Sequence, residues 1–173
     1  METSYAVEGQ RQTVKSDRGD RAYTRAGVVP TPVFTRSRKA YPMLRYPWAD
    51  ARAALESMAA DQPELETVQV TYVNPETGEH AENILGFYAL MLRPAQTLTL
   101  PARSPASVFH LIEGGVDVVI EQSRFALAVA DTCCAPGYTS VTLSNRHADV
   151  PAFIFMADET PLHKKLGVFE VRA

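Results

Sequence analysis

The feature that most constrains the fold is a series of short apolar runs that begins after Pro63 and continues to the end of the chain. Each run is rich in β-branched and aromatic residues and is bounded by turn-forming residues, a texture typical of β-strands. The breaks at residues 74–78 (NPETG), 114–115 (GG) and 136–137 (PG) are strong turn signals. The expected strands are residues 67–73, 84–92, 108–112, 116–120, 125–129, 139–143, 152–156 and 168–171. Spacing this close favours an all-β sandwich or barrel over alternating strands and helices.

Two segments precede the β series. Residues 47–60 are rich in helix formers, and Trp48 and Leu55 are spaced to share one face, which predicts one short helix. Residues 1–40 are polar and mixed in charge, without an apolar period, so we interpret them as an N-terminal arm that is solvated or draped over a partner subunit. The expected organisation is this arm followed by one domain, residues 41–173, with the helix ahead of the barrel.

Composition limits the function classes. With 173 residues, 46% of them hydrophobic, the chain can bury the core of one domain. A net charge of −3 is too small to predict nucleic-acid or membrane-surface binding, and no apolar run is long enough to span a bilayer. Met1 is not followed by a secretory signal pattern, and the two cysteines, Cys133 and Cys134, are adjacent and indicate no disulfide framework. We expect a cytoplasmic protein with no nucleic-acid and no membrane partner, and a homodimer formed through the arm and outer strands.

Two segments match the spacing of the paired motifs of the cupin superfamily. The first motif runs from a glycine through His-x-His and a glutamate to a second glycine, and it aligns with residues 95–114. The second runs from a glycine through Pro-x-Gly and a histidine to an asparagine, and it aligns with residues 130–145. Every interval fits, and the turn-shaping residues are kept at Gly114, Pro136 and Asn145. The resemblance implies a single cupin barrel of the jelly-roll type.

The metal-ligand positions of these motifs hold residues unsuited to a metal ion. They are Pro101, Arg103, Ser107 and Val141. A mononuclear metal site needs imidazole or carboxylate donors, whereas proline and valine supply none and arginine is a permanent cation. A rebuilt metal site that uses His110 stays an alternative, but strand alternation from Ser107 places His110 outside the barrel and argues against it. We therefore expect no metal and no cofactor in this barrel.

A closer resemblance lies within the superfamily. The chain resembles the C-terminal cupin of gentisate 1,2-dioxygenases and of related salicylate and hydroxynaphthoate ring-cleaving enzymes, over roughly residues 41–173. The resemblance rests on residues 46–48 (YPW), 72–78 (YVNPETG), 103–104 (RS), 108–114 (VFHLIEG) and 166–169 (LGVF). Those enzymes are bicupins about twice this length, and the resemblance implies that their iron, held by histidines, lies in the N-terminal cupin. This chain corresponds to the other half.

Arg103 is the most informative candidate site residue. An unpaired guanidinium inside an apolar barrel is costly, so it needs a partner. That partner is either the carboxylate or phenolate of a small aromatic ligand, bound bidentately, or an internal acid such as Asp131 or Asp158, or water at the barrel rim. The other candidate ligand-binding residues, polar and apolar groups expected to line a pocket, are Ser107, Phe109, Tyr88, Tyr138, Thr139, Val141 and Leu143.

Three functional hypotheses follow. The first is a stand-alone, metal-independent cupin that binds a small organic acid, with aromatic acids among the candidates, and carries out non-redox chemistry on it. The second is a structural or regulatory module equivalent to the non-iron half of a gentisate-dioxygenase-like bicupin. The third is a ring-cleaving dioxygenase with an unusual iron site, and it ranks last because the motif's ligand positions lack metal-binding side chains. None of the three assigns a catalytic residue.

Overall fold

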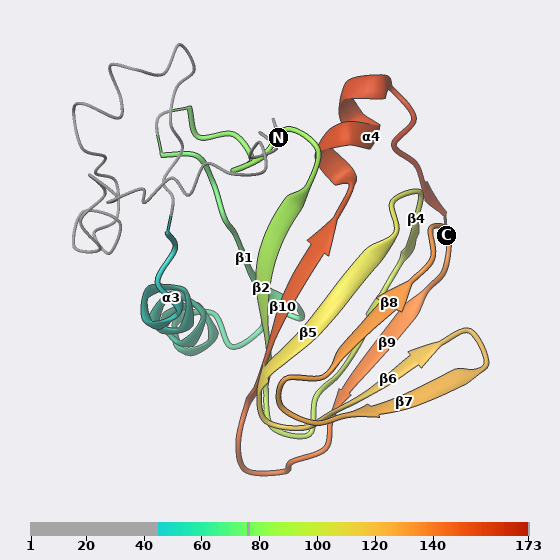
Figure 1. Ribbon diagram of the computed structural model, residues 1–173. Coiled ribbons are helices and arrows are strands. Elements are labelled where there is room, and N and C mark those ends of the chain that lie inside the picture. The colour runs from blue at the N-terminus through green and yellow to red at the C-terminus, as the bar shows by residue number, and fades with distance from the viewer. Residues whose placement is uncertain (1–44, 76, 173) are drawn as a thin grey trace, which may run out of the picture. The chain divides into compact units, whose positions relative to one another are not determined.

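The computed structural model describes residues 45–75 and 77–172, so the predicted arm, residues 1–40, lies outside the described residues. Within them the chain is mostly β-strand, with one helix ahead of the strands and one near their end (Figure 1). No helix in these ranges is long and apolar enough to cross a membrane. The elements are α3 (Trp48–Asp61), β1 (Val68–Thr71), β2 (Gly86–Leu92), β3 (Thr97–Leu100), β4 (Ala102–Arg103), β5 (Ser107–Glu113), β6 (Val116–Ile120), β7 (Ser123–Leu127), β8 (Thr132–Ala135), β9 (Val141–Asn145), β10 (Ala152–Asp158), α4 (Thr160–Leu166) and β11 (Val171–Arg172).

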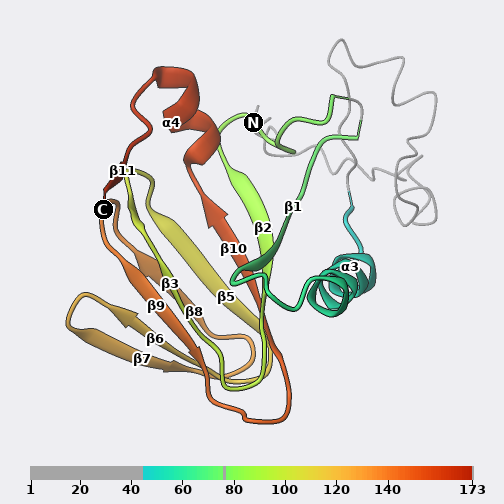
Figure 2. The same cartoon turned by 180° about the vertical axis from the view of Figure 1, so that it is seen from behind.

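Two antiparallel sheets face each other in a jelly-roll arrangement (Figure 2). The larger has the strand order β1-β2-β10-β5-β8, the smaller has the order β3-β9-β6-β7, and β11 pairs separately with β4. The core between the two sheets is built from large apolar side chains that are almost fully buried. They include Leu90, Leu92, Phe109, Leu111, Val116, Val118, Leu143, Ile154 and Met156. The all-β barrel predicted from the series of short strands is therefore the observed fold.

Strand β5 shows how alternation assigns side chains to the two faces of the larger sheet. Ser107, Phe109 and Leu111 are buried toward the core, whereas Val108 and His110 point outward. His110 Nδ1 lies 2.8 Å from the hydroxyl of Thr132 on the neighbouring strand β8. As alternation from Ser107 predicted, His110 lies outside the barrel.

Helix α3 covers one end of the outer face of the larger sheet. Leu55 is fully buried in a second apolar cluster with sheet residues, including Phe153 of β10. The Trp48 ring meets Phe153 edge-on at 5.6 Å between centroids, and Trp48 Nε1 donates a 2.8 Å hydrogen bond to Glu113 Oε1. This aromatic and polar contact fixes the helix over β1, β2 and β10. Helix α3 does not contact the remainder of the outer face.

Several elements differ from the sequence prediction. Strands expected at 125–129 and 139–143 are observed two residues away, as β7 and β9, and the run at 168–171 contributes only its last residue to β11. Two strands, β3 and β4, were not predicted, because they are short and carry threonine or arginine instead of a long apolar run. Helix α4 was also not predicted. In the sequence its proline indicates the end of a helix, although proline also fits the first turn of one, where it lies here.

The glycine positions of the two motifs fall on left-handed backbone. Gly114 has φ 93°, and Ala95 and Ala130, which align with the leading glycines, have φ 55° and 73°. A side chain at Gly114 would also place its Cβ 2.9 Å from the Cβ of Ala152. The turns of the motifs are therefore kept even where alanine replaces glycine, and an alanine in this region carries steric strain.

Replacing Ala130 by glycine should stabilise the protein, because glycine adopts positive φ without the Cβ clash. We expect the free energy of unfolding to rise by about 0.5–1 kcal/mol, measured by urea denaturation. Ala126→Gly is the matched control, since Ala126 lies in the regular strand β7 and is also exposed; there glycine should lower stability. Equal effects of the two substitutions would contradict the assignment of strain to Ala130.

Candidate functional site

Five of the residues predicted to bind a ligand line one hollow at the end of the barrel near α4. They are Arg103, Ser107, Phe109, Thr139 and Val141. The remaining lining residues are Leu100, Pro101, Pro105, Ala135 and Pro136. The hollow measures about 10 Å³, which is room for roughly one water molecule. Pockets for drug-sized ligands are on the order of 300 Å³ or more, so an aromatic acid would need the side chains to move apart.

The other three predicted residues lie elsewhere. Leu143 is fully buried in the core between the sheets. Tyr138 is exposed at the rim with φ 62°, and its hydroxyl donates to Glu170 Oε2 at 3.0 Å while the Arg172 guanidinium lies over its ring. Tyr88 on β2 is buried, and its hydroxyl donates to Asp158 Oδ1 at 3.3 Å. The structure thus divides the predicted set among the hollow, the core, the rim and a buried acid cluster.

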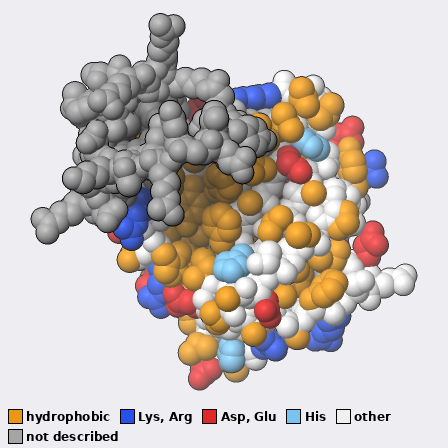
Figure 3. Space-filling view, in the orientation of Figure 1, with side chains coloured by type: hydrophobic (Ala, Val, Ile, Leu, Met, Phe, Trp, Pro, Cys, Tyr) orange, Lys and Arg blue, Asp and Glu red, His pale blue; other side chains and the backbone are white. Residues whose placement is uncertain are grey.

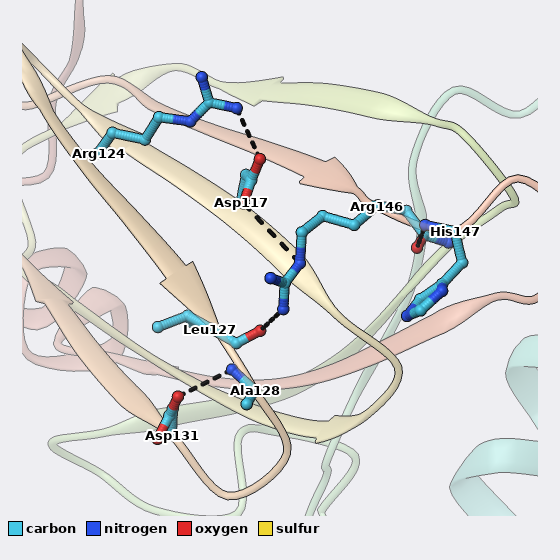
Figure 4. A network of polar contacts seen from close by, with 8 residues as sticks. Asp117, Arg124, Leu127, Ala128, Asp131, Arg146 and His147 are labelled. Carbon is cyan, nitrogen blue, oxygen red and sulfur yellow. Dashed lines mark hydrogen bonds and ion pairs between the residues drawn. The ribbon is translucent and has the colours of Figure 1, made fainter.

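The partner of Arg103 in this structure is an internal acid. Arg103 Nη2 lies 3.1 Å from Asp158 Oδ2, and the Asp158 side chain is fully buried while that of Arg103 is 21% exposed. Asp158 also accepts a hydrogen bond from the backbone N–H of Thr160 at 2.9 Å. The other acid that the sequence offered, Asp131, instead accepts from the backbone N–H of Ala128 at 2.8 Å (Figure 4). A charge pair with added hydrogen bonds is the arrangement that makes burial of a carboxylate tolerable.

Burial of Tyr88 beside Asp158 changes its acidity. Desolvation, and then the charge of Asp158, raise the pKa of Tyr88 to about 12. Removing the phenol proton would put a second negative charge beside the Asp158 carboxylate. Tyr88 is therefore a hydrogen-bond donor at any ordinary pH, and its chemistry here is to support Asp158.

Further polar contacts join the segment before β5 to α4 and the C-terminal segment. The hydroxyl of Ser104 lies 2.9 Å from His163 Nδ1 and accepts a hydrogen bond from the backbone N–H of Glu170 at 3.0 Å. Glu159 accepts from the backbone N–H of Ala106 at 2.9 Å. The sequence analysis did not select these residues, because isolated polar residues in turns carry no distinguishing signal. Together they close the α4 end of the barrel.

A separate polar network holds the hairpin of the smaller sheet (Figure 4). Asp117 forms ion pairs with Arg124 at 2.6 Å and with Arg146 at 3.8 Å, and Arg146 Nη2 donates to the carbonyl of Leu127. Next to it, the side-chain amide of Asn145 donates to the carbonyls of Arg93 and Val150, at 3.0 and 2.9 Å. The motif asparagine is thus a structural clamp, and every charge in this network has a protein partner.

The residues at the ligand positions of the two motifs do not fit an iron ion. Pro101 and Val141 offer no donor, and Arg103 brings a positive charge that is held by the nearest carboxylate, Asp158. Across residues 45–75 and 77–172, no group of three or more His, Cys, Asp or Glu side chains is arranged to hold a metal. We therefore derive no reaction step through iron in this barrel.

Removing one member of the buried ion pair should destabilise the barrel. In Arg103→Met the Asp158 carboxylate keeps its neutral donors but loses the cation, and we expect a loss of about 2–3 kcal/mol in the free energy of unfolding. The double variant Arg103→Met/Asp158→Asn should recover part of this loss, because asparagine needs no counter-charge. A double-mutant cycle by urea denaturation measures the coupling. Strictly additive effects would show that the two groups are not coupled.

Stability should fall at high pH in a manner that depends on Tyr88. Its pKa is about 12 in the folded protein against 10.0 for the unperturbed phenol. The unfolded chain therefore loses this proton first, so the contribution is complete below pH 10 and is lost as the pH rises toward 12. Tyr88→Phe should flatten the decline of unfolding free energy over that interval, measured by denaturation at a series of pH values. An unchanged slope would refute the assignment.

Comparison with curated proteins finds three relatives, all named as 1,2-dioxygenases of aromatic acids. The chain is 73% identical over 172 residues to a gentisate 1,2-dioxygenase of a Ralstonia species, a match that covers 99% of the chain and 48% of that protein. It is 24% identical over 136 residues to a 5-aminosalicylate 1,2-dioxygenase of a Comamonas species, covering 77% of the chain and 36% of the relative. The chain spans about half the length, or less, of these relatives. No protein-family model matches it.

Comparison with solved structures gives the same fold. The salicylate 1,2-dioxygenase of Pseudaminobacter salicylatoxidans superposes with a TM-score of 0.69 at 20% identity, over 90% of this chain and 45% of that one. Its complex with gentisate superposes with a TM-score of 0.70, again at 20% identity and over 90% of this chain, with 43% of that chain covered. Identity this low supports the fold alone. The chain therefore has the jelly-roll fold of these dioxygenases and is similar, over nearly its whole length, to one half of a gentisate 1,2-dioxygenase.

Proposed function

We propose that this barrel is the non-iron half of a ring-cleaving dioxygenase of the gentisate type, and that the iron chemistry takes place in a second cupin. The observation that carries the proposal is the residue found at one of the motif's metal-ligand positions. There, Arg103 is ion-paired to the buried Asp158 at 3.1 Å. An arginine held in this way is a structural element of the barrel wall and takes the place that a metal ligand has in the motif.

The interior of the barrel supports the same role. Phe109, Val141 and Leu143 fill the space between the sheets, and the hollow beside Arg103 holds roughly one water molecule. A filled, tightly paired barrel is suited to supporting and orienting a neighbouring domain. The chain is highly identical to about half of the Ralstonia gentisate 1,2-dioxygenase, which supports a neighbouring domain that is a cupin acting on a dihydroxylated benzoate.

Binding of a small organic acid by this chain alone, as a metal-independent protein, is the second proposal. The acid would have to compete with Asp158 for Arg103 and open a hollow of about 10 Å³. We rank it below the first because both steps cost free energy before any contact with the ligand is made.

A chimera tests the first proposal. This chain replaces the matching residues of the Ralstonia gentisate 1,2-dioxygenase, so that the rest of that enzyme supplies the second half. We expect iron-dependent oxygen uptake with gentisate from the chimera, because the supporting contacts of the replaced half are retained. We expect no gentisate-dependent uptake from this chain alone after incubation with Fe(II).

The unmodified Ralstonia enzyme is the positive control for the assay. Turnover by this chain alone with Fe(II) would place the chemistry in this barrel and overturn the proposal. An inactive chimera that is folded and has bound iron would show that the chain does not serve as the supporting half. Stabilisation of this chain by hydroxybenzoates without iron, lost in Arg103→Ala, would favour the small-acid proposal instead.

A further inference from the structure

Part of the outer face of the larger sheet, next to the outward-facing His110 and Thr132, is apolar where an exposed sheet face is normally polar. Phe87, Ala157, Val108 and Cys134 lie in register across β2, β10, β5 and β8, and all four point away from the core. Phe155 lies in the next row of the same face and stacks on Phe87 with 6.0 Å between ring centroids. We call these five residues the outer patch. None is charged, whereas an antiparallel sheet with one free face usually alternates apolar and polar residues.

Helix α3 does not cover the outer patch. Its apolar cluster ends at Phe153 and Ala89, with Tyr72 and Ile112 at its margin. Beyond that cluster Val108 is 38% exposed, Cys134 is exposed, and Phe87, Phe155 and Ala157 are half-buried. Figure 3, in the orientation of Figure 1, shows hydrophobic side chains gathered on the face formed by these strands, with a hollow among them. Contiguous apolar surface of this kind marks an interaction site.

We propose that the outer patch is the surface on which the second, iron-bearing cupin half docks, an inference that rests on the proposed function. The Ralstonia relative supplies the occupant, because this chain matches 48% of it and the rest is long enough for a second barrel. Aromatic and aliphatic side chains without charges are the composition of the core of a permanent interface. An anionic ligand or a nucleic acid would require cations, and the patch has none.

The two adjacent cysteines provide a built-in probe of this surface. Cys134 belongs to the patch and is exposed, whereas Cys133, one residue earlier on β8, packs against the core. Burial raises the pKa of the Cys133 thiol, which further lowers its reactivity. Covering the outer patch should therefore protect Cys134 and leave Cys133 slow in every state.

The experiment compares labelling by a neutral maleimide in this chain alone and in the chimera, with the labelled cysteine located by mass spectrometry. We expect Cys134 to react about tenfold or more slowly in the chimera, because docking removes it from solvent. Equal, fast labelling in both would overturn the proposal. Equal, slow labelling in both would also overturn it, because the patch would then be covered within this chain or by a second copy.

A matched pair of substitutions tests the same surface independently of thiol chemistry. Val108→Lys places a charge in the patch, and Val129→Lys places the same charge in the loop between β7 and β8, where Val129 is 57% exposed. In the chimera, Val108→Lys should restore fast labelling of Cys134 and lower gentisate turnover about tenfold, whereas Val129→Lys should leave both unchanged.

The two variants in this chain alone show whether an effect comes from docking. Their melting temperatures should match, because both positions face away from the core. A much larger loss of melting temperature for Val108→Lys would mean that this chain covers its own patch. A dimer of the chain that only Val108→Lys dissociates in sedimentation would identify a second copy as the occupant. Either result overturns the proposal. If the parent chimera is active and the two variants behave alike, the docking surface is wrong while the proposed function stands.

Discussion

The Asp158 carboxylate is the contact on which the α4 end of the barrel depends. It is fully buried at the end of β10 and joins three other elements, through Arg103 of β4, Tyr88 of β2 and the first backbone N–H of α4. A buried carboxylate is costly unless it is paired and hydrogen-bonded. The buried charge of Asp158 is stable only with these partners, so each of them is held in place. The same requirement leaves Arg103 with a structural role at a position where the cupin motif has a metal ligand.

A second constraint comes from the larger sheet, which is apolar on its inner face and over much of its outer face. Its inner face meets the smaller sheet, and one end of its outer face meets α3 through Leu55 and Trp48. A sheet that is apolar on both sides is stable in water only when both sides are covered. The outer patch is the part that α3 leaves uncovered. The uncovered outer patch is the observation on which the proposed docking of a second cupin half rests.

The sequence predicted the fold well because fold information is local in this chain. Short apolar runs, turn residues and motif spacing identified the barrel, and the left-handed backbone at Ala95 and Ala130 follows the motif even without glycine. The partner of Arg103 was not decidable, because Asp131 and Asp158 are equally acidic in sequence and only the pairing of β10 with β5 brings one of them near. The outer patch was not predicted either. Alternation identifies two faces, but an apolar outer face such as that of Phe87 and Val108 is seen only when the neighbouring strands are known.

The residues that shape the turns of the two motifs are separate from the residues at the metal-ligand positions. The backbone turns depend on Gly114, Ala130 and Asn145, whose roles are conformational or clamping and involve no metal. Of the ligand positions, Arg103, Ser107 and Val141 lie on strands β4, β5 and β9, whereas Pro101 lies between β3 and β4. Val141 is buried in the interior, Arg103 is ion-paired to Asp158, and Pro101 is exposed at the edge of the hollow. In the proposed supporting half, docking therefore involves the outside of the barrel, where the uncharged outer patch lies.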